Sequence, residues 1–90
     1  MYSIEYTERA KQDFALLRKN DPASFKKALR LTVELMEHPK TETGHPEQLK
    51  GDKTGKWSRR ITKHHRLVYE IREQQIIVLI LTAYGHYDDK

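Results

Sequence analysis

Cysteine is absent from the 90 residues, so the chain can form neither a disulfide nor a thiolate metal site, in agreement with a reducing compartment. No apolar run approaches the roughly 18 residues that a membrane-spanning helix needs. The first ten residues also lack the basic-then-apolar pattern of a signal peptide, and repeats and low-complexity tracts are missing. We therefore expect a single domain over residues 1–90, with no membrane contact and a cytoplasmic location.

Positive charge is concentrated in the second half of the chain. Between positions 50 and 72 there are eight Lys or Arg and two acidic residues, net +6, whereas residues 1–49 contain eight of each sign. The formal charge of +4 for the whole chain is thus a local feature. A concentrated basic segment predicts a surface that meets a polyanion, and a nucleic acid is the first candidate.

Hydrophobic periodicity at the start predicts a short strand and a helix. Residues 2–6 alternate between apolar and polar, which is typical of a strand with one buried side. Thr7 can cap a helix over residues 8–19, because its hydroxyl can accept a hydrogen bond from the first turn. The apolar stripe of this helix is Ala10, Phe14 and Leu17.

A second helix is predicted after the junction of Asp21 and Pro22. Asp21 supplies an N-cap carboxylate, and Pro22 suits the first helical position because its missing N–H would have no partner there. The pattern ends at His38, before Pro39, and the two helices should be antiparallel. The predicted buried stripe is Phe25, Ala28, Leu29, Thr32, Leu35 and Met36.

The second half predicts a long loop followed by three strands. Glycine and proline among polar residues indicate a loop over residues 40–56, with a short turn around 47–50. Strands are expected over 57–62 and 65–71, and the run 76–84 is apolar on both faces, as in a central strand.

The element order β-α-α-β-β-β describes an α+β domain. We expect two helices packed on one face of a small, mainly antiparallel sheet, with the other face free to bind. Arg66 should lie on a rigid strand and point away from the face that carries Leu67, Tyr69 and Ile71.

Basic and aromatic side chains of the second half have two interpretations. The basic ones can form an ordinary solvated sheet face or a phosphate-binding surface, and their concentration favours the second. They are Lys50, Lys53, Lys56, Arg59, Arg60, Lys63 and Arg66. Trp57, Tyr84 and Tyr87 lie among them and could stack on unpaired bases, although Trp57 could equally fill the core.

The five histidines do not predict a metal site. They are His38, His45, His64, His65 and His86, and no pair has the HxxxH spacing that places two imidazoles on one helical face. We expect no metal and no cofactor.

Metal-independent RNA cleavage needs a base for the ribose 2′-OH, a cation for the phosphoryl oxygens and an acid for the departing 5′-oxygen. The chain offers one candidate for each role: Glu47 in the loop, Arg66 on its strand and His86 near the end. Composition and spacing alone do not establish that the three act together.

The run GHPEQLKGDKTGKWSRRITKHHRLVYEI with the ending GHY resembles the YoeB/Txe toxins of bacterial toxin–antitoxin systems, within the RelE superfamily. The strings PEQLK, GKWSRRI and HRLVY are similar to the family residue by residue, and the helices are similar by pattern. After the His-Tyr pair this chain continues with Asp88, Asp89 and Lys90, where family members end.

The resemblance implies a microbial-ribonuclease-like fold and an mRNA interferase that cuts messenger RNA in the ribosomal A site. It also implies a homodimer and neutralisation by a YefM-type antitoxin, with DNA bound only through the antitoxin complex. By the resemblance, Glu47 is the general base, Arg66 stabilises the transition state and His86 is the general acid. The substrate-binding positions that it implies are Tyr87, Lys50, Arg59 and Arg60.

Two other interpretations remain open at the level of sequence. The same basic surface could belong to a non-catalytic module that binds RNA or the ribosome. The chain could also be an inactive homologue that only binds its antitoxin.

Overall fold

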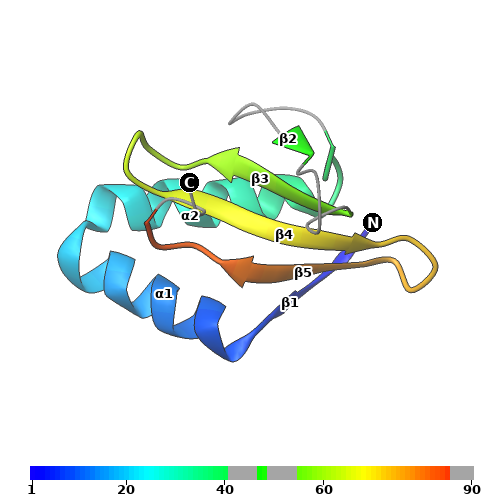
Figure 1. Cartoon of the computed structure of the whole chain (residues 1–90), viewed down its shortest axis with the longest axis horizontal. Coiled ribbons are helices and arrows are strands. Elements are labelled where there is room, and N and C mark those ends of the chain that lie inside the picture. Colours follow the sequence, from blue (N-terminus) through cyan, green and yellow to red (C-terminus); the bar gives the residue numbers. More distant parts are fainter. Residues whose placement is uncertain (41–46, 49–54, 86–90) are drawn as a thin grey trace.

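The computed structural model describes residues 1–40, 47–48 and 55–85 (Figure 1). Within these residues the elements in chain order are β1 (Ser3–Tyr6), α1 (Glu8–Asn20), α2 (Pro22–Leu35), β2 (Glu47–Gln48), β3 (Lys56–Arg60), β4 (Arg66–Arg72) and β5 (Ile77–Thr82). The predicted α+β class, with two helices and a mainly antiparallel sheet, is confirmed.

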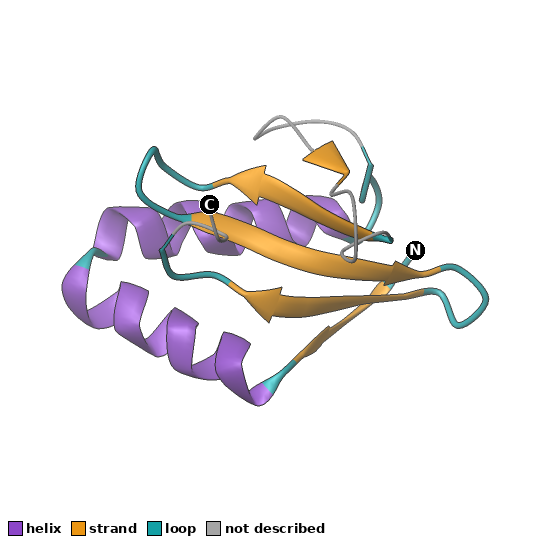
Figure 2. Cartoon of the chain, in the orientation of Figure 1, coloured by secondary structure: helices purple, strands orange, loops and turns teal. Residues whose placement is uncertain are grey.

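The strands described form one sheet in the order β1-β5-β4-β3-β2 (Figure 2). The β5–β4, β4–β3 and β3–β2 pairs are antiparallel, and β1 is parallel to β5. The predicted apolar strand is β5, which lies between β1 and β4, while β4 occupies the middle of the sheet. The basic strands β3 and β4 are therefore adjacent.

Both helices begin where local capping chemistry predicts. The Thr7 hydroxyl accepts a hydrogen bond from the amide of Ala10 at 3.0 Å, and the Asp21 carboxylate accepts one from the amide of Ser24 at 3.3 Å. Helix α2 ends at Leu35 rather than at the predicted His38, since the chain makes a turn at Met36 and Glu37. Element starts were thus easier to locate than this end.

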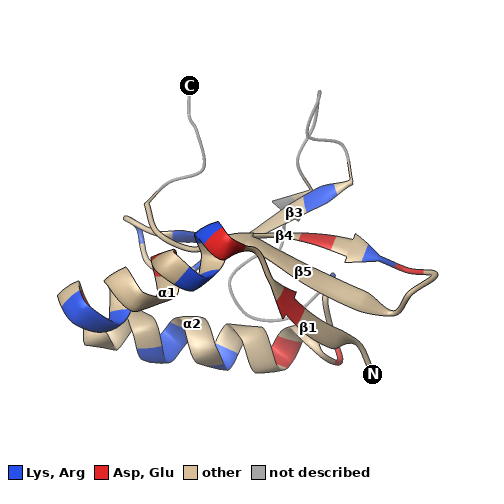
Figure 3. Cartoon of the chain, turned by 90° about the horizontal axis from the view of Figure 1, so that it is seen from below, with Lys and Arg blue, Asp and Glu red and all other residues tan. Residues whose placement is uncertain are grey.

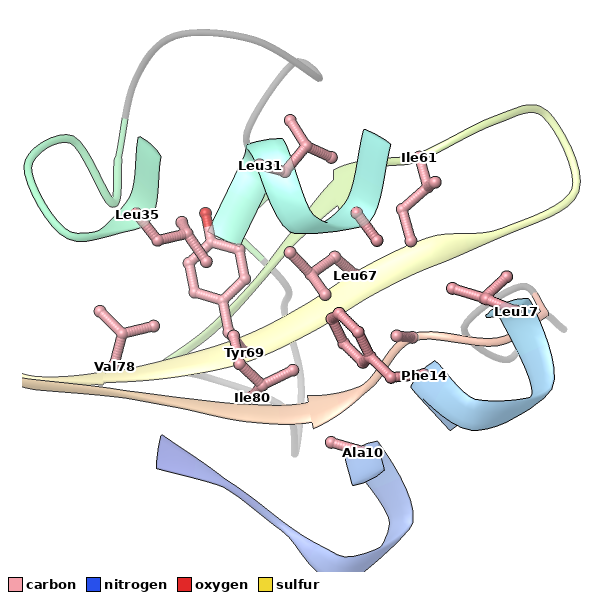
Figure 4. Packing of buried hydrophobic residues seen from close by; sticks show 12 residues of the cluster. Ala10, Phe14, Leu17, Leu31, Leu35, Ile61, Leu67, Tyr69, Val78 and Ile80 are labelled. Atoms are coloured by element: carbon pink, nitrogen blue, oxygen red, sulfur yellow. The ribbon is translucent and has the colours of Figure 1, made fainter. Parts of the chain in front are cut away.

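The core lies between the helices and one face of the sheet, where side chains of both helices meet those of β4 and β5 (Figure 4). Leu31 and Leu35 of α2 are buried in it, whereas Leu29, which we predicted to be buried, is 41% exposed. That prediction was wrong because the buried stripe of α2 passes through Ala28, Leu31 and Leu35. From the sheet, Tyr69 of β4 and Ile80 of β5 contribute to the same core.

The strands of the second half differ in part from the predicted boundaries. Positions 47 and 48 form the short strand β2, paired with β3, rather than a turn. Strands β3 and β4 begin and end within two residues of the predicted limits, at Lys56–Arg60 and Arg66–Arg72. Of the rest of the predicted loop, residues 41–46 and 49–54 lie outside the described residues.

The sheet face opposite the helices is only partly open. Seen edge-on, both helices lie on one side of the sheet (Figure 3). Ser58 and Val68 face the other side, yet they are only 1% and 4% exposed. The prediction that this whole face is free to bind was therefore wrong at its middle. Basic residues remain exposed or half-buried nearby, at Arg60 and Arg66.

Candidate active site

Arg66 is the first residue of β4 and lies on the face of the sheet opposite the helices. Its Nη1 donates a hydrogen bond to the hydroxyl of Ser58 on β3 at 3.2 Å, and its side chain is half-buried. Strand pairing explains the contact: Ser58 is opposite Val68, and Arg60 is opposite Arg66. The guanidinium is thus held on a rigid sheet.

Strand β2 places the backbone of Glu47 beside Ser58. Glu47 pairs with Ser58 and Gln48 with Trp57, both in antiparallel register. Ser58 therefore links the two predicted catalytic positions, because its backbone is paired with Glu47 and its hydroxyl accepts from Arg66. The side chain of Glu47 is outside the described part of the structure.

Gly85, the last described residue, is bonded to the start of β4. The main-chain N–H of Arg66 donates to the Gly85 carbonyl at 3.0 Å, and the N–H of Gly85 donates to His65 Nδ1 at 2.8 Å. The backbone φ of Gly85 is +82°, in the left-handed region that favours glycine. His86 and Tyr87 lie outside the described residues.

Asp13 of α1 holds the two residues that precede Gly85. Its Oδ2 accepts hydrogen bonds from the amides of Ala83 at 2.9 Å and Tyr84 at 3.3 Å, and its Oδ1 accepts from Arg9 Nε at 3.0 Å. The Asp13 side chain is buried, and these bonds compensate its lost hydration. Helix α1 thereby fixes the path of the chain after β5.

The Tyr84 ring is engaged within the protein. It packs against His65, with ring centroids 4.7 Å apart and an interplanar angle of 33°, and it also contacts the hydrophobic core. Asn20 donates to its hydroxyl at 3.5 Å. The interpretation of Tyr84 as a base-stacking residue is not favoured by these contacts, since one ring face covers His65.

Arg59 does not belong to a phosphate-binding surface. Its side chain points to the helices, is 0% exposed and donates from Nη1 to Glu34 Oε1 at 3.1 Å. The guanidinium also donates to Tyr69 Oη and to the carbonyl of His38. The prediction of substrate binding by Arg59 was wrong, because alternation along β3 puts Arg59 on the helix side and Arg60 on the other side.

Tyr69 extends this buried network to the start of the loop. Its hydroxyl donates to the carbonyl of Pro39 at 2.6 Å. Burial raises the pKa of Tyr69 above its ordinary value, and the Arg59 guanidinium opposes that shift. The neutral phenol and Arg59 together attach residues 38 and 39 to the sheet, which fixes where the segment leading to Glu47 departs.

The remaining predicted substrate-binding residues have different placements. Trp57 is half-buried and packs against the core on the helix side, as the core-filling interpretation requires. Arg60 is exposed and pairs with Arg66 on the open face. Lys50 lies outside the described residues.

Asp13 and His65 are the functional candidates that sequence reasoning missed. Asp13 had a detectable signal: a carboxylate at a core position of α1, next to Phe14, must find buried donors. His65 had none, because its partner Gly85 is 20 residues away in the sequence. Only the sheet brings them together.

Within the part of the chain that the structure describes, no group of three or more His, Asp or Glu side chains could hold a metal ion. In the same residues, neither helix is long and apolar enough to cross a bilayer.

Solved structures of bacterial toxins share this architecture over nearly the whole chain. The YoeB/ParE toxin from Agrobacterium tumefaciens superposes with a TM-score of 0.88 and 30% identity, covering 94% of this chain and 99% of that one. The YoeB of Staphylococcus aureus, solved as a dimer and in a YoeB-YefM complex, superposes with a TM-score of 0.82 in both cases. It is 31% and 30% identical in the two structures, over 96% and 97% of this chain and 98% and 99% of the toxin chains. The fold is thus that of the RelE-like toxins.

Sequence comparison narrows the class to one family. The family of YoeB-like toxins of bacterial type II toxin–antitoxin systems matches residues 6–87. A toxin YoeB from Streptomyces coelicolor is 37% identical over 84 residues, which are 93% of this chain and 98% of that protein. The chain belongs to the YoeB-like toxin family, as its sequence motifs predict.

Proposed function

We propose that this toxin is an endoribonuclease that cleaves mRNA in the ribosomal A site without a metal or cofactor. Membership of the YoeB-like family supports the toxin role. The observation that carries the catalytic proposal is the position of Arg66. It contacts Ser58, whose backbone pairs with Glu47, and it bonds to Gly85, which directly precedes His86.

Glu47 is the general base and His86 the general acid of the proposed reaction. Glu47 takes the proton of the ribose 2′-OH, and the freed oxygen attacks the adjacent phosphorus. The bond from phosphorus to the 5′-oxygen breaks, and His86 donates a proton to that oxygen. The products are a 2′,3′-cyclic phosphate on the upstream fragment and a 5′-hydroxyl on the downstream fragment.

Arg66 stabilises the charge that gathers on the non-bridging phosphoryl oxygens during this attack. Arg66 lies on a β-strand, and its guanidinium is held by a hydrogen bond to Ser58. The side chain therefore needs little reorganisation at the moment of reaction. Arg60, exposed on the same face, and Lys50 contact flanking phosphates. Tyr87 positions the substrate by stacking on a base.

A YefM-type antitoxin is the proposed protein partner, and a homodimer is the proposed state of the free toxin. The structures of S. aureus YoeB as a dimer and with YefM support both assignments. An antitoxin segment that covers the basic face around Arg60 and Arg66 would compete with RNA for it.

The decisive experiment expresses the wild type and Glu47→Gln from an inducible promoter and maps the 5′ ends of cellular mRNA. We expect new ends within translated codons for the wild type. Loss of the base should reduce cleavage about 10²- to 10⁴-fold. Glu37→Gln makes the same charge change at an exposed site after α2 and should cleave like the wild type.

A 2′-deoxy nucleotide at the cleavage position tests the chemistry directly, because it removes the attacking oxygen. Undiminished cutting of that substrate on the ribosome would refute the mechanism. Growth inhibition that persists in the double variant Glu47→Gln, Arg66→Ala would instead indicate a non-catalytic module that binds RNA or the ribosome.

A further inference from the structure

The segment from Ala83 to Gly85 is held by side chains from two distant parts of the chain. Asp13 accepts the amides of Ala83 and Tyr84, and His65 accepts the amide of Gly85. All three consecutive N–H groups therefore have side-chain acceptors, although no strand pairing continues there. This arrangement fixes the backbone more tightly than the end of a strand requires.

His65 is itself a rigid anchor. Its carbonyl accepts hydrogen bonds from the amides of Ile61 at 3.0 Å and Thr62 at 3.1 Å, which close the turn between β3 and β4. Its ring lies against Tyr84, so the direction of Nδ1 is set by packing. The bond from Gly85 requires that Nδ1 carry no proton, which leaves it as an acceptor.

The anchored residue directly precedes the proposed general acid. Arg66 holds the Gly85 carbonyl while His65 holds its N–H, which constrains both peptide groups of this residue. We propose that His65 is a positioning residue, whose Nδ1 orients Gly85, the residue that precedes the proposed general acid.

The inference rests on the proposed ribonuclease activity, and it deepens that proposal by adding a residue that does not touch RNA. Two substitutions separate the acceptor from the ring. His65→Phe keeps a flat ring against Tyr84 and removes the acceptor. His65→Asn loses the ring but can place its Oδ1 near the position of Nδ1. His64→Phe is the matched control, since His64 is the exposed neighbour in the same turn.

Single-turnover cleavage of ribosome-bound mRNA distinguishes a positioning role from a structural one. His65→Phe should lower the maximal cleavage rate about 10- to 100-fold, because a misplaced acid loses catalytic geometry. The toxin concentration that gives half of the maximal rate should stay unchanged. His65→Asn should restore most of the rate, and His64→Phe should match the wild type. Equal rates for His65→Phe and the wild type would overturn the proposal, as would equal losses in His65→Phe and His65→Asn.

Hydrogen exchange at the Gly85 amide tests the anchor without any cleavage assay. We expect protection in the wild type, His65→Asn and His64→Phe, and faster exchange in His65→Phe. Unchanged protection in His65→Phe would overturn the anchor itself. A protected Gly85 amide in a wild type that never cuts RNA would overturn the proposed activity while supporting the anchor.

Discussion

The guanidinium of Arg59 and the carboxylate of Glu34 form an ion pair of 3.1 Å between β3 and α2. Arg59 has no exposed side-chain surface, while that of Glu34 is 26% exposed. One of the basic residues of the charged segment therefore joins the sheet to a helix instead of meeting RNA. Together with Tyr69 it also attaches the chain where the loop begins.

Replacement of Arg59 by alanine should reduce stability rather than RNA affinity alone. Loss of the guanidinium removes its hydrogen bonds to Glu34 and Tyr69. Breaking a buried ion pair of this kind costs about 3 kcal/mol of unfolding free energy. Urea denaturation measures this change. Arg60→Ala is the matched control, because the neighbouring side chain is exposed.

Arg60→Ala should change the unfolding free energy by less than about 0.5 kcal/mol and should weaken binding of RNA. If Arg59→Ala proved as stable as Arg60→Ala, the structural role assigned to the Arg59–Glu34 pair would be refuted.

Thr7→Ala should destabilise the protein by about 1 to 2 kcal/mol. The hydroxyl accepts the amide of Ala10 and donates to the carbonyl of Leu81 at 2.8 Å, so it caps α1 and links it to β5. Thermal denaturation followed by circular dichroism measures the loss. Thr7→Ser retains the hydroxyl and should lie within about 0.5 kcal/mol of the wild type; a serine variant as unstable as the alanine variant would contradict the capping role.

Gly85→Ala should cost catalysis as well as stability. Its φ of +82° is strained for alanine, at about 1 to 2 kcal/mol, although no atom lies within 4 Å of the added Cβ. Gly55→Ala is the matched control, with φ +91° and equal space. Both variants should lose similar unfolding free energy in urea, while only Gly85→Ala should slow mRNA cleavage by more than about tenfold. Equal rates of mRNA cleavage in the two variants would show that the backbone conformation of Gly85 has no special role in catalysis.

Asp21 should make the protein sensitive to acid. Hydrogen bonds from the Ser24 side chain and amide lower the pKa of Asp21 below its ordinary value of 3.8. The folded-state pKa is thus depressed, so the stabilisation is fully present above 3.8 and is lost as the pH falls through the folded pKa.

The measurement is the unfolding free energy in urea across this acidic range, for the wild type and Asp21→Asn. Asparagine caps helices without titrating, so its stability should fall less steeply with decreasing pH. Parallel curves for the two proteins would show that the Asp21 cap does not contribute to the acid sensitivity.

The predicted catalytic residues were recognised through sequence motifs, and the structure describes only part of their surroundings. Arg66 lies where alternation along its strand predicts, on the face away from Leu67 and Tyr69. The roles of Glu47 and His86 stay predictions, since neither side chain is in the described part of the structure. Alternation could not separate Arg59 from the basic surface, because it assigns two faces without saying which one a helix covers.

Local chemistry in the sequence determined the helix starts at Thr7 and Asp21, the strands β3, β4 and β5, and the YoeB-like family. These features depend on neighbours within a few residues or on short motifs. Tertiary structure decided the burial of Arg59 and the hydrogen bonds of Gly85 to His65 and Arg66. The Gly85 bonds join residues 19 and 20 positions apart, and the Arg59–Glu34 pair joins residues 25 positions apart. Only the packing of α2 on the sheet and the pairing of the sheet's strands bring these residues within bonding distance.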